Sequence, residues 1–258
     1  MKRKILMSMG GTEQGWSRHN DEGIFRDYEA EVKVLFESAK PWGLNCFKLD
    51  NDYIHNLPYY EHYRNVFDRV SFGFAFKAVG YYEMFKAMNF GDIAFFVDSN
   101  HLIQTDPTPF YMMADEHEAF VHDHIWTFYP NKDWTRRDTF VNMGCDDPVY
   151  WNAPQMQFNI SGFKKTPKTQ KFVDELFRYS TDYRVMFGEN KYPNFPSLKE
   201  HRHDQSIYSI LCAKYEFPYI NRTQNVWAEY VIPETQGIIP TVRVDNTHRM
   251  EEDRKDNK

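Results

Sequence analysis

The chain has 258 residues, with 31 Lys or Arg against 37 Asp or Glu, and its formal net charge at pH 7 is −6. This balance argues against nucleic acid as the main partner, because binding to a phosphate backbone needs an excess of clustered cations. Aromatic residues make up 17% of the chain, whereas disordered chains contain few of them. We therefore expect a globular enzyme or binding protein, of a length typical of one domain.

The N-terminal region shows neither a signal peptide nor a membrane anchor. Its apolar run starts at Lys4 and ends within a few residues, whereas a signal peptide needs roughly 7–15 apolar residues and a spanning helix about 20. Cys46, Cys145 and Cys212 form no Cys-x-x-Cys pair and no readable disulfide framework. These features predict a cytoplasmic protein without a transmembrane segment.

Short apolar runs alternate with a helical pattern in the first fifty residues. The runs 4–9 and 45–49 predict strands, and the first of them stops at Gly10. Between them, residues 28–39 carry apolar side chains at the spacing of one helix face. Strands alternating with helices predict an α/β fold with parallel strands in its first half.

A helix followed by a buried strand is predicted next. Apolar side chains recur at helical spacing over 81–88, and Gly91 supplies the stop. The uninterrupted apolar run 93–97 predicts a strand that is buried on both faces.

The second half of the chain predicts two more helices and a loop. Thr166 is a candidate N-cap with Pro167 at the first helical position. Residues 187–200 predict a loop, and Asp204 is the predicted N-cap of a last helix. The polar residues 251–258 predict a frayed tail after a single domain over 1–250.

Asp98 and Asn100 follow the buried strand directly. The carboxyl end of a strand is where open α/β sheets bind ligands, and two oxygen-bearing side chains two residues apart can face one hard cation or the hydroxyls of a ribose. Asp98 is equally suited to capping the turn after the strand. The position therefore predicts a ligand site or a turn.

Six residues, 201–206, hold two imidazoles, a guanidinium, a carboxylate and an amide immediately before a helix. A helix N-terminus beside cationic side chains favours anionic groups such as phosphate. The competing interpretation makes Asp204 a simple cap in a solvated loop. The density of polar chemistry favours a functional role.

His122 and His124 lie at alternate positions of a strand-like run, which would place both rings on one face. Together with His201 and His203, they form a candidate metal centre. A His-metal hydrolase is thus one alternative function.

The succession of these blocks resembles the GT-A-fold glycosyltransferases, specifically the small capsular-polysaccharide and viral nucleotide-diphospho-sugar transferases. The resemblance spans roughly residues 4–250 and is carried, in order, by Phe74–Gly80, Gly91–Asp98, Gln155–Thr166, His201–Ser206 and Thr247–Arg249. It implies a single-domain, Rossmann-like α/β fold with a mostly parallel central sheet flanked by helices. It also implies a hexosyl- or pentosyltransferase, placed in the host cytoplasm if the source is viral.

The resemblance also implies residue roles. The partners would be a nucleotide-diphosphate sugar, most simply a UDP-sugar, and a glycan or glycolipid-precursor acceptor. Asp204 and Gln205 would flank the transferred sugar, and a divalent metal, Mn²⁺ or Mg²⁺, would be the cofactor. The remaining roles are donor binding by Gly11, Thr12, Lys77, Asp98 and His203, and metal binding by Asp98, Asn100 and His248.

Two departures from the family pattern keep a second alternative open. Asn100 stands where many relatives carry Asp, and Ala78 stands where many carry Pro. A neutral amide in place of an anionic ligand weakens a metal site. A non-catalytic protein that binds a sugar nucleotide or a glycan on a transferase-like fold is therefore the alternative to catalysis.

Overall fold

The computed structural model describes residues 2–10, 28–69, 73–123, 129–220 and 241–243. The strands of this part of the chain are β1 (Lys4–Met9), β2 (Asn45–Leu49), β3 (Ile93–Val97), β4 (His101–Ile103), β5 (Ala119–Asp123), β6 (Met156–Lys164) and β7 (Thr241–Arg243). The α-helices of five or more residues are α1 (Tyr28–Ala39), α2 (Asn51–His55), α4 (Phe76–Ala87), α5 (Thr108–His117), α6 (Arg137–Asn142), α8 (Pro167–Ser180) and α10 (His203–Lys214). Single turns complete the set, namely α3 (Arg64–Phe67), α7 (Pro148–Trp151), α9 (Tyr183–Met186), η2 (Lys40–Trp42), η3 (Glu61–Tyr63) and η5 (Asn131–Asp133).

Most of the predicted elements that fall on described residues are confirmed. β1, α1, β2 and β3 have the predicted bounds, and the helix predicted over 81–88 is the second half of α4. Thr166 caps α8, because its side chain accepts a hydrogen bond from the backbone N–H of Thr169. Residues 187–200 form a loop without helix or strand. The predicted tail 251–258 lies outside the described residues.

The central sheet has five strands in the order β2-β1-β3-β6-β5. β1 pairs in parallel with β2 and β3, whereas β6 runs antiparallel to β3 and β5. Four strands thus point the same way and β6 alone is reversed, which confirms the mostly parallel sheet. A second, antiparallel pair joins β4 to β7.

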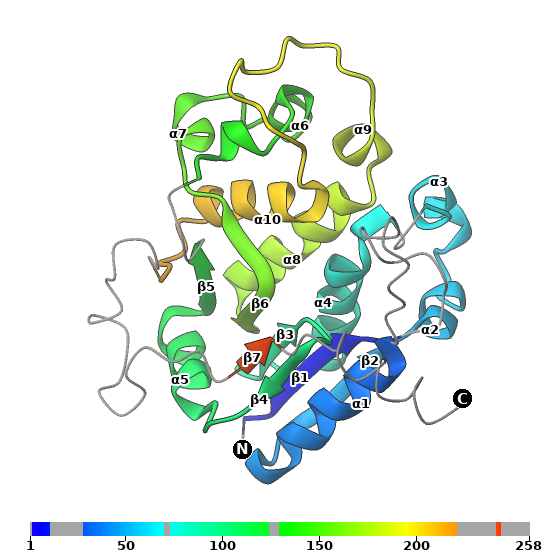
Figure 1. Cartoon of the computed structure of the whole chain (residues 1–258), viewed down its shortest axis with the longest axis vertical. Coiled ribbons are helices and arrows are strands. Elements are labelled where there is room, and N and C mark those ends of the chain that lie inside the picture. The colour runs from blue at the N-terminus through cyan, green and yellow to red at the C-terminus, as the bar shows by residue number, and fades with distance from the viewer. Residues whose placement is uncertain (1, 11–27, 70–72, 124–128, 221–240, 244–258) are drawn as a thin grey trace, which may run out of the picture.

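Helices cover both faces of the sheet, so the described residues form one α/β domain (Figure 1). On one face α4, α8 and α10 pack in the larger hydrophobic cluster. On the other face α1, α5 and β4 bury the side chains that alternate to that side. Adjacent Phe95 and Phe96 fall in different clusters, as the two-residue period of a strand requires.

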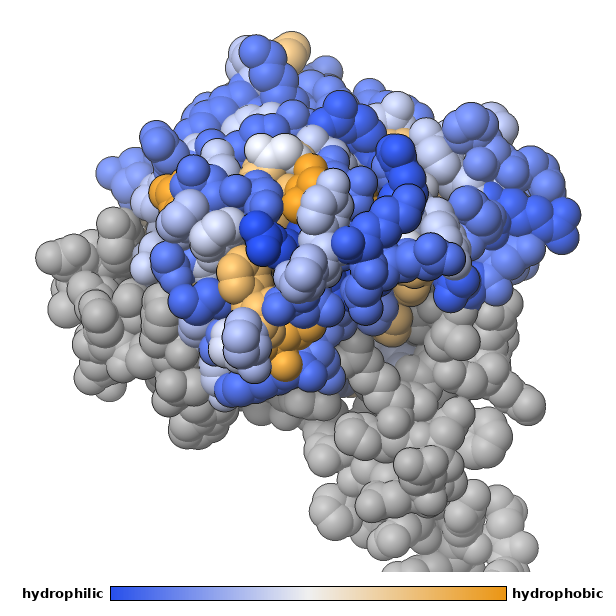
Figure 2. Space-filling model, turned by 90° about the horizontal axis from the view of Figure 1, so that it is seen from above, coloured by the Kyte–Doolittle hydropathy of each residue, from blue (hydrophilic) through white to orange (hydrophobic). Residues whose placement is uncertain are grey.

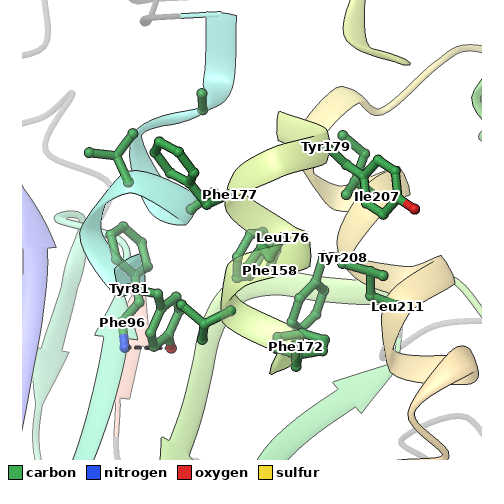
Figure 3. Close-up of a cluster of buried hydrophobic side chains, with 14 of the residues drawn as sticks. Tyr81, Phe96, Phe158, Phe172, Leu176, Phe177, Tyr179, Ile207, Tyr208 and Leu211 are labelled. Carbon is green, nitrogen blue, oxygen red and sulfur yellow. Dashed lines mark hydrogen bonds between the residues drawn. The ribbon is translucent and has the colours of Figure 1, made fainter. Parts of the chain in front are cut away.

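Aromatic rings fill the larger cluster (Figure 3). The rings of Phe158 on β6 and Tyr208 on α10 stack with centroids 4.0 Å apart and an interplanar angle of 5°. Tyr81 on α4 is fully buried; its hydroxyl donates to Ser161 O and accepts from the Phe96 backbone N–H. Burial raises the pKa of Tyr81, so the hydroxyl stays protonated and can donate.

The surface that Figure 2 shows is mainly hydrophilic, with hydrophobic residues visible between polar ones. Within the described ranges, no helix combines the length and the apolar character needed to cross a bilayer.

Candidate functional site

The turn after β3 presents Asp98 and Asn100 at the carboxyl edge of the sheet. The backbone N–H of Asp98 donates to Asn159 O on β6 at 2.8 Å. Between the two residues, the buried Ser99 hydroxyl donates to Glu31 Oε2 on α1 at 2.7 Å. The turn is therefore held from β6 and from α1, while the Asp98 side chain keeps 34% of its surface exposed.

Lys77, in the first turn of α4, reaches the same place. Its ammonium donates to Phe158 O at 2.7 Å and forms an ion pair with Asp98 Oδ1 at 3.0 Å. The Lys77 side chain is only 10% exposed. The structure thus brings together two predicted donor-binding residues that are well separated in the chain.

The start of α10 differs from the prediction. The helix begins at His203 and its N-cap position is Arg202, with no side-chain cap. Asp204 is therefore not the N-cap; it lies inside the first turn, where a carboxylate is stabilised by the positive end of the helix dipole. The backbone ahead of the helix is held by Ser206, whose hydroxyl accepts from Arg202 N–H and donates to Trp134 O.

His203, which is predicted to bind the sugar-nucleotide donor, lies among aromatic rings. Its centroid is 5.0 Å from that of Phe74, 5.2 Å from Phe187 and 4.9 Å from His201. The backbone of His203 is left-handed, with φ of 43°. This conformation costs free energy in residues other than glycine. Burial, with smaller contributions from His203 and Arg136, holds the pKa of His201 well below its usual value.

The low pKa of His201 predicts acid sensitivity. The unfolded chain takes up a proton at this residue near pH 6.5, whereas the folded chain does not, so stability falls as the pH drops below about 6.5. We expect the free energy of unfolding to fall by up to about 1.4 kcal/mol per pH unit there. Urea unfolding at several pH values across this range measures the free energy of unfolding. That free energy should depend less steeply on pH for His201→Gln than for wild type.

β6 connects the two parts of the site. Asn159 O binds the Asp98 backbone, and Met156 N–H donates to the Ser209 hydroxyl of α10 at 2.8 Å. These two β6 positions are three residues apart along the strand, which corresponds to about 10 Å. Because β6 is reversed, its first residues lie at the edge where β3 ends, which places the start of α10 near the Lys77–Asp98 pair.

Several predicted residues lie outside the described ranges. They are Gly11 and Thr12, expected beside the nucleotide base, the expected ligand His248, and His124 of the histidine alternative. Among the described residues no group of three or more His, Cys, Asp or Glu could hold a metal ion. The histidine hydrolase thus has no ligand set in that part of the chain.

Asp98 and Asn100 carry the oxygen atoms that Mg²⁺ and Mn²⁺ accept as ligands. One Asp98 oxygen already faces the Lys77 ammonium. The Asp98 side chain is partly exposed, so its second carboxylate oxygen can bind a cation. Such a cation would compete with the Lys77 ammonium for the Asp98 carboxylate. Asp98 and Asn100 are therefore side chains of the type that binds such an ion.

Sequence reasoning gave no role to a group of buried polar atoms beside α10. Gln155 is 1% exposed, and neither its amide oxygen nor its amide nitrogen has a hydrogen-bond partner. Nearby Trp134 Nε1 and Thr135 Oγ1 are likewise buried without partners. The sequence placed Gln155 at the start of a strand, but burial without a partner is a property of the folded chain only.

No protein-family profile matches the chain, and no curated protein matches its sequence. The solved structures to which the chain is similar include three glycosyltransferases. One is a glycosyltransferase involved in the glycosylation of the major capsid of PBCV-1, with 13% identity, 97% of this chain and 98% of that chain covered, and a TM-score of 0.44. The second is mouse xyloside xylosyltransferase 1 in its apo form, with 10% identity, 94% and 98% covered, and a TM-score of 0.47.

The third is the galactosyltransferase LgtC in complex with donor and acceptor sugar analogues. It shares 10% identity, with 96% of this chain and 94% of that chain covered, and its TM-score is 0.45. Identities this low transfer no residue roles to this chain.

Proposed function

We propose that the protein is a glycosyltransferase that moves a sugar from a nucleotide-diphosphate donor, most simply a UDP-sugar, to a glycan or glycolipid-precursor acceptor. One observation carries the proposal. The Lys77–Asp98 pair and the polar first turn of α10 lie at one edge of the sheet. β6 binds both the Asp98 backbone and α10, and the His203 ring at the start of α10 lies 5.0 Å from the ring of Phe74, three residues before Lys77. A sugar nucleotide could place its phosphates toward the Lys77 ammonium and its sugar toward Asp204.

The proposed roles follow from this orientation. Lys77 and His203 would face the diphosphate, Gly11 and Thr12 the base, and Asp98 the ribose or the metal. A divalent cation on Asp98, Asn100 and His248 would stabilise the negative charge of the leaving diphosphate. The cation and all residue assignments are part of the proposal, as is the cytoplasmic location.

Asp204 and Gln205 would act at the sugar. Cleavage of the bond between the anomeric carbon and the diphosphate oxygen leaves the electron pair on that oxygen and positive character on the sugar ring. A carboxylate in the first turn of α10 would stabilise that positive character. The acceptor hydroxyl then forms the new bond to the anomeric carbon and passes its proton to the leaving diphosphate.

A screen of UDP-, GDP- and dTDP-sugars with and without Mn²⁺ tests the proposal. We expect one of these donors to bind and to be hydrolysed slowly without an acceptor, because water can replace the acceptor hydroxyl. Calorimetry measures the binding, and release of the nucleoside diphosphate measures the reaction. Absence of binding and of hydrolysis for every donor would overturn the proposal.

A non-catalytic sugar-nucleotide or glycan-binding protein is the second candidate. Asn100 is neutral, and Asp98 is paired with Lys77; both reduce the negative charge available to a metal. Tight calorimetric binding of a sugar nucleotide without turnover, with metal present, would favour this candidate.

A further inference from the structure

Glu31 is a carboxylate on the core-facing side of α1. The buried residues of this helix are Glu31, Val32, Leu35 and Ala39, and the last three have the spacing of an apolar helix face. Glu31 lies four residues before Leu35, so it occupies a position on that face where an apolar side chain is expected, and it is only 4% exposed. Burial of a carboxylate costs free energy. Such departures from the local pattern are typical of functional sites.

The Glu31 carboxylate binds the chain immediately after β3. Ser99 Oγ donates to Glu31 Oε2 at 2.7 Å, and Ser99 is itself only 7% exposed. A hydrogen bond to an ionised group is stronger than one between neutral groups. The residues on either side of Ser99 are Asp98 and Asn100, and both are only partly buried. Ser99 thus faces α1, while its two neighbours keep exposed surface.

Residues 98–101 form a tight turn between β3 and β4. The His101 N–H donates to Asp98 O at 3.2 Å, which closes the turn. The bond from the Ser99 side chain to α1 anchors the middle of the same turn. An anchor at that point limits the rotation of the turn about the axis of β3, and with it the directions of the Asp98 and Asn100 side chains.

We infer that Glu31 and Ser99 are positioning residues of the donor site. Through their hydrogen bond they hold Asp98 and Asn100 in the orientation that binds the ribose or the divalent cation. This role rests on the proposed function, which assigns both residues to the donor and the metal. Lys77 on α4 binds the Asp98 carboxylate, and α4 and α1 cover opposite faces of the sheet. The turn is therefore held from both faces, as ligand-bearing segments commonly are by hydrogen bonds behind the ligands.

A second contact between α1 and the same segment supplies a matched control. The Ser38 hydroxyl accepts from the Ile103 N–H at 2.9 Å and donates to Leu35 O at 2.6 Å. It joins the same helix to the chain three residues beyond Asn100, in β4 rather than in the turn. Ser38→Ala therefore weakens the attachment of α1 to β4 and leaves the Ser99 anchor in place.

The test uses the full chain and calorimetric binding of UDP, GDP and dTDP in the presence of Mn²⁺. We expect Ser99→Ala and Glu31→Ala each to bind the nucleotide that wild type prefers about tenfold more weakly. Glu31→Gln keeps an oxygen that accepts from the Ser99 hydroxyl, so it should recover most of that affinity. Ser38→Ala should bind as wild type, even if its melting temperature is lower. Unchanged binding in Ser99→Ala, or an equal loss in Ser38→Ala, would overturn the inference.

A double-mutant cycle shows whether Ser99 acts through Asp98. Two residues that act independently have additive effects, whereas a positioning residue loses its effect when the side chain that it positions is absent. In the Asp98→Ala background we therefore expect Ser99→Ala to weaken nucleotide binding by only about twofold or less. The full tenfold loss in both backgrounds would contradict the positioning role, because it would show that Ser99 acts on binding by another route.

The wild-type measurements keep the two proposals distinguishable. If wild type binds a nucleotide and Ser99→Ala binds it equally well, the positioning role is wrong and the proposed function stands. If wild type binds none of the nucleotides and none of the corresponding sugar nucleotides, the proposed function fails and the positioning role fails with it.

Discussion

Asp98→Asn is expected to reduce sugar transfer by about a thousandfold, equivalent to about 4 kcal/mol of barrier, while the protein stays folded. The amide oxygen of Asn can still accept a hydrogen bond from Lys77 Nζ, which lies 3.0 Å from Asp98 Oδ1, so the local packing survives. The negative charge that a metal or a ribose hydroxyl needs is lost. Steady-state kinetics with the donor identified by screening, together with the melting temperature, measure both effects.

Removing the Asp98 side chain has a structural effect as well. In Asp98→Ala the nearly buried Lys77 ammonium keeps Phe158 O and loses its counter-charge, which should lower the free energy of unfolding by about 1–3 kcal/mol. The double variant Asp98→Ala/Lys77→Met removes both charges and should recover most of that stability without recovering activity. Full activity in Asp98→Asn, or renewed activity in the double variant, would remove Asp98 from the site.

Asp204→Asn is expected to lower turnover by about a hundredfold, or about 2.7 kcal/mol of barrier, with little change in donor affinity. The substitution removes the charge proposed to stabilise the positive sugar ring but changes the shape of the side chain very little. Because Asp204 is not the N-cap of α10, the substitution leaves the helix cap unchanged, and the weakened interaction with the helix dipole should lower the free energy of unfolding by about 0.3–1 kcal/mol. Kinetics beside urea unfolding measure the two quantities.

Asp174→Asn on α8 is the matched control, since it makes the same change on a helix that borders the core but not the site. Gln205→Ala should lower the turnover number, with a smaller effect on the free energy of unfolding. His203→Ala should mainly raise the KM for the donor. Wild-type turnover in Asp204→Asn would leave Asp204 with a purely structural role.

Local patterns predicted the elements well. β3 is an uninterrupted apolar run between a glycine turn and Asp98, and both limits are visible without tertiary information. The start of α10 was misplaced by two residues because Asp204 is a good capping residue by type. The real cap position is Arg202, and it depends on Ser206 and Trp134 O, a partner 72 residues from Ser206.

The candidate site was predictable only in part. The strand end at Asp98 and the polar density at 201–206 are local features. The Lys77–Asp98 contact and the reversed direction of β6 are pairings across the fold. Whether the Gln155 amide has a hydrogen-bond partner depends on the residues that surround it in the fold, and local sequence patterns do not identify those residues.

Phe158 has consequences for the range of substrates that variants of this protein can acquire. Its ring stacks on Tyr208 in the core and its carbonyl accepts from Lys77. A change at Phe158 therefore alters the packing of α10 and the position of the ammonium at the same time. In directed evolution toward a new sugar, tolerated substitutions should accumulate in the loop 187–200, while Phe158 and Tyr208 stay invariant.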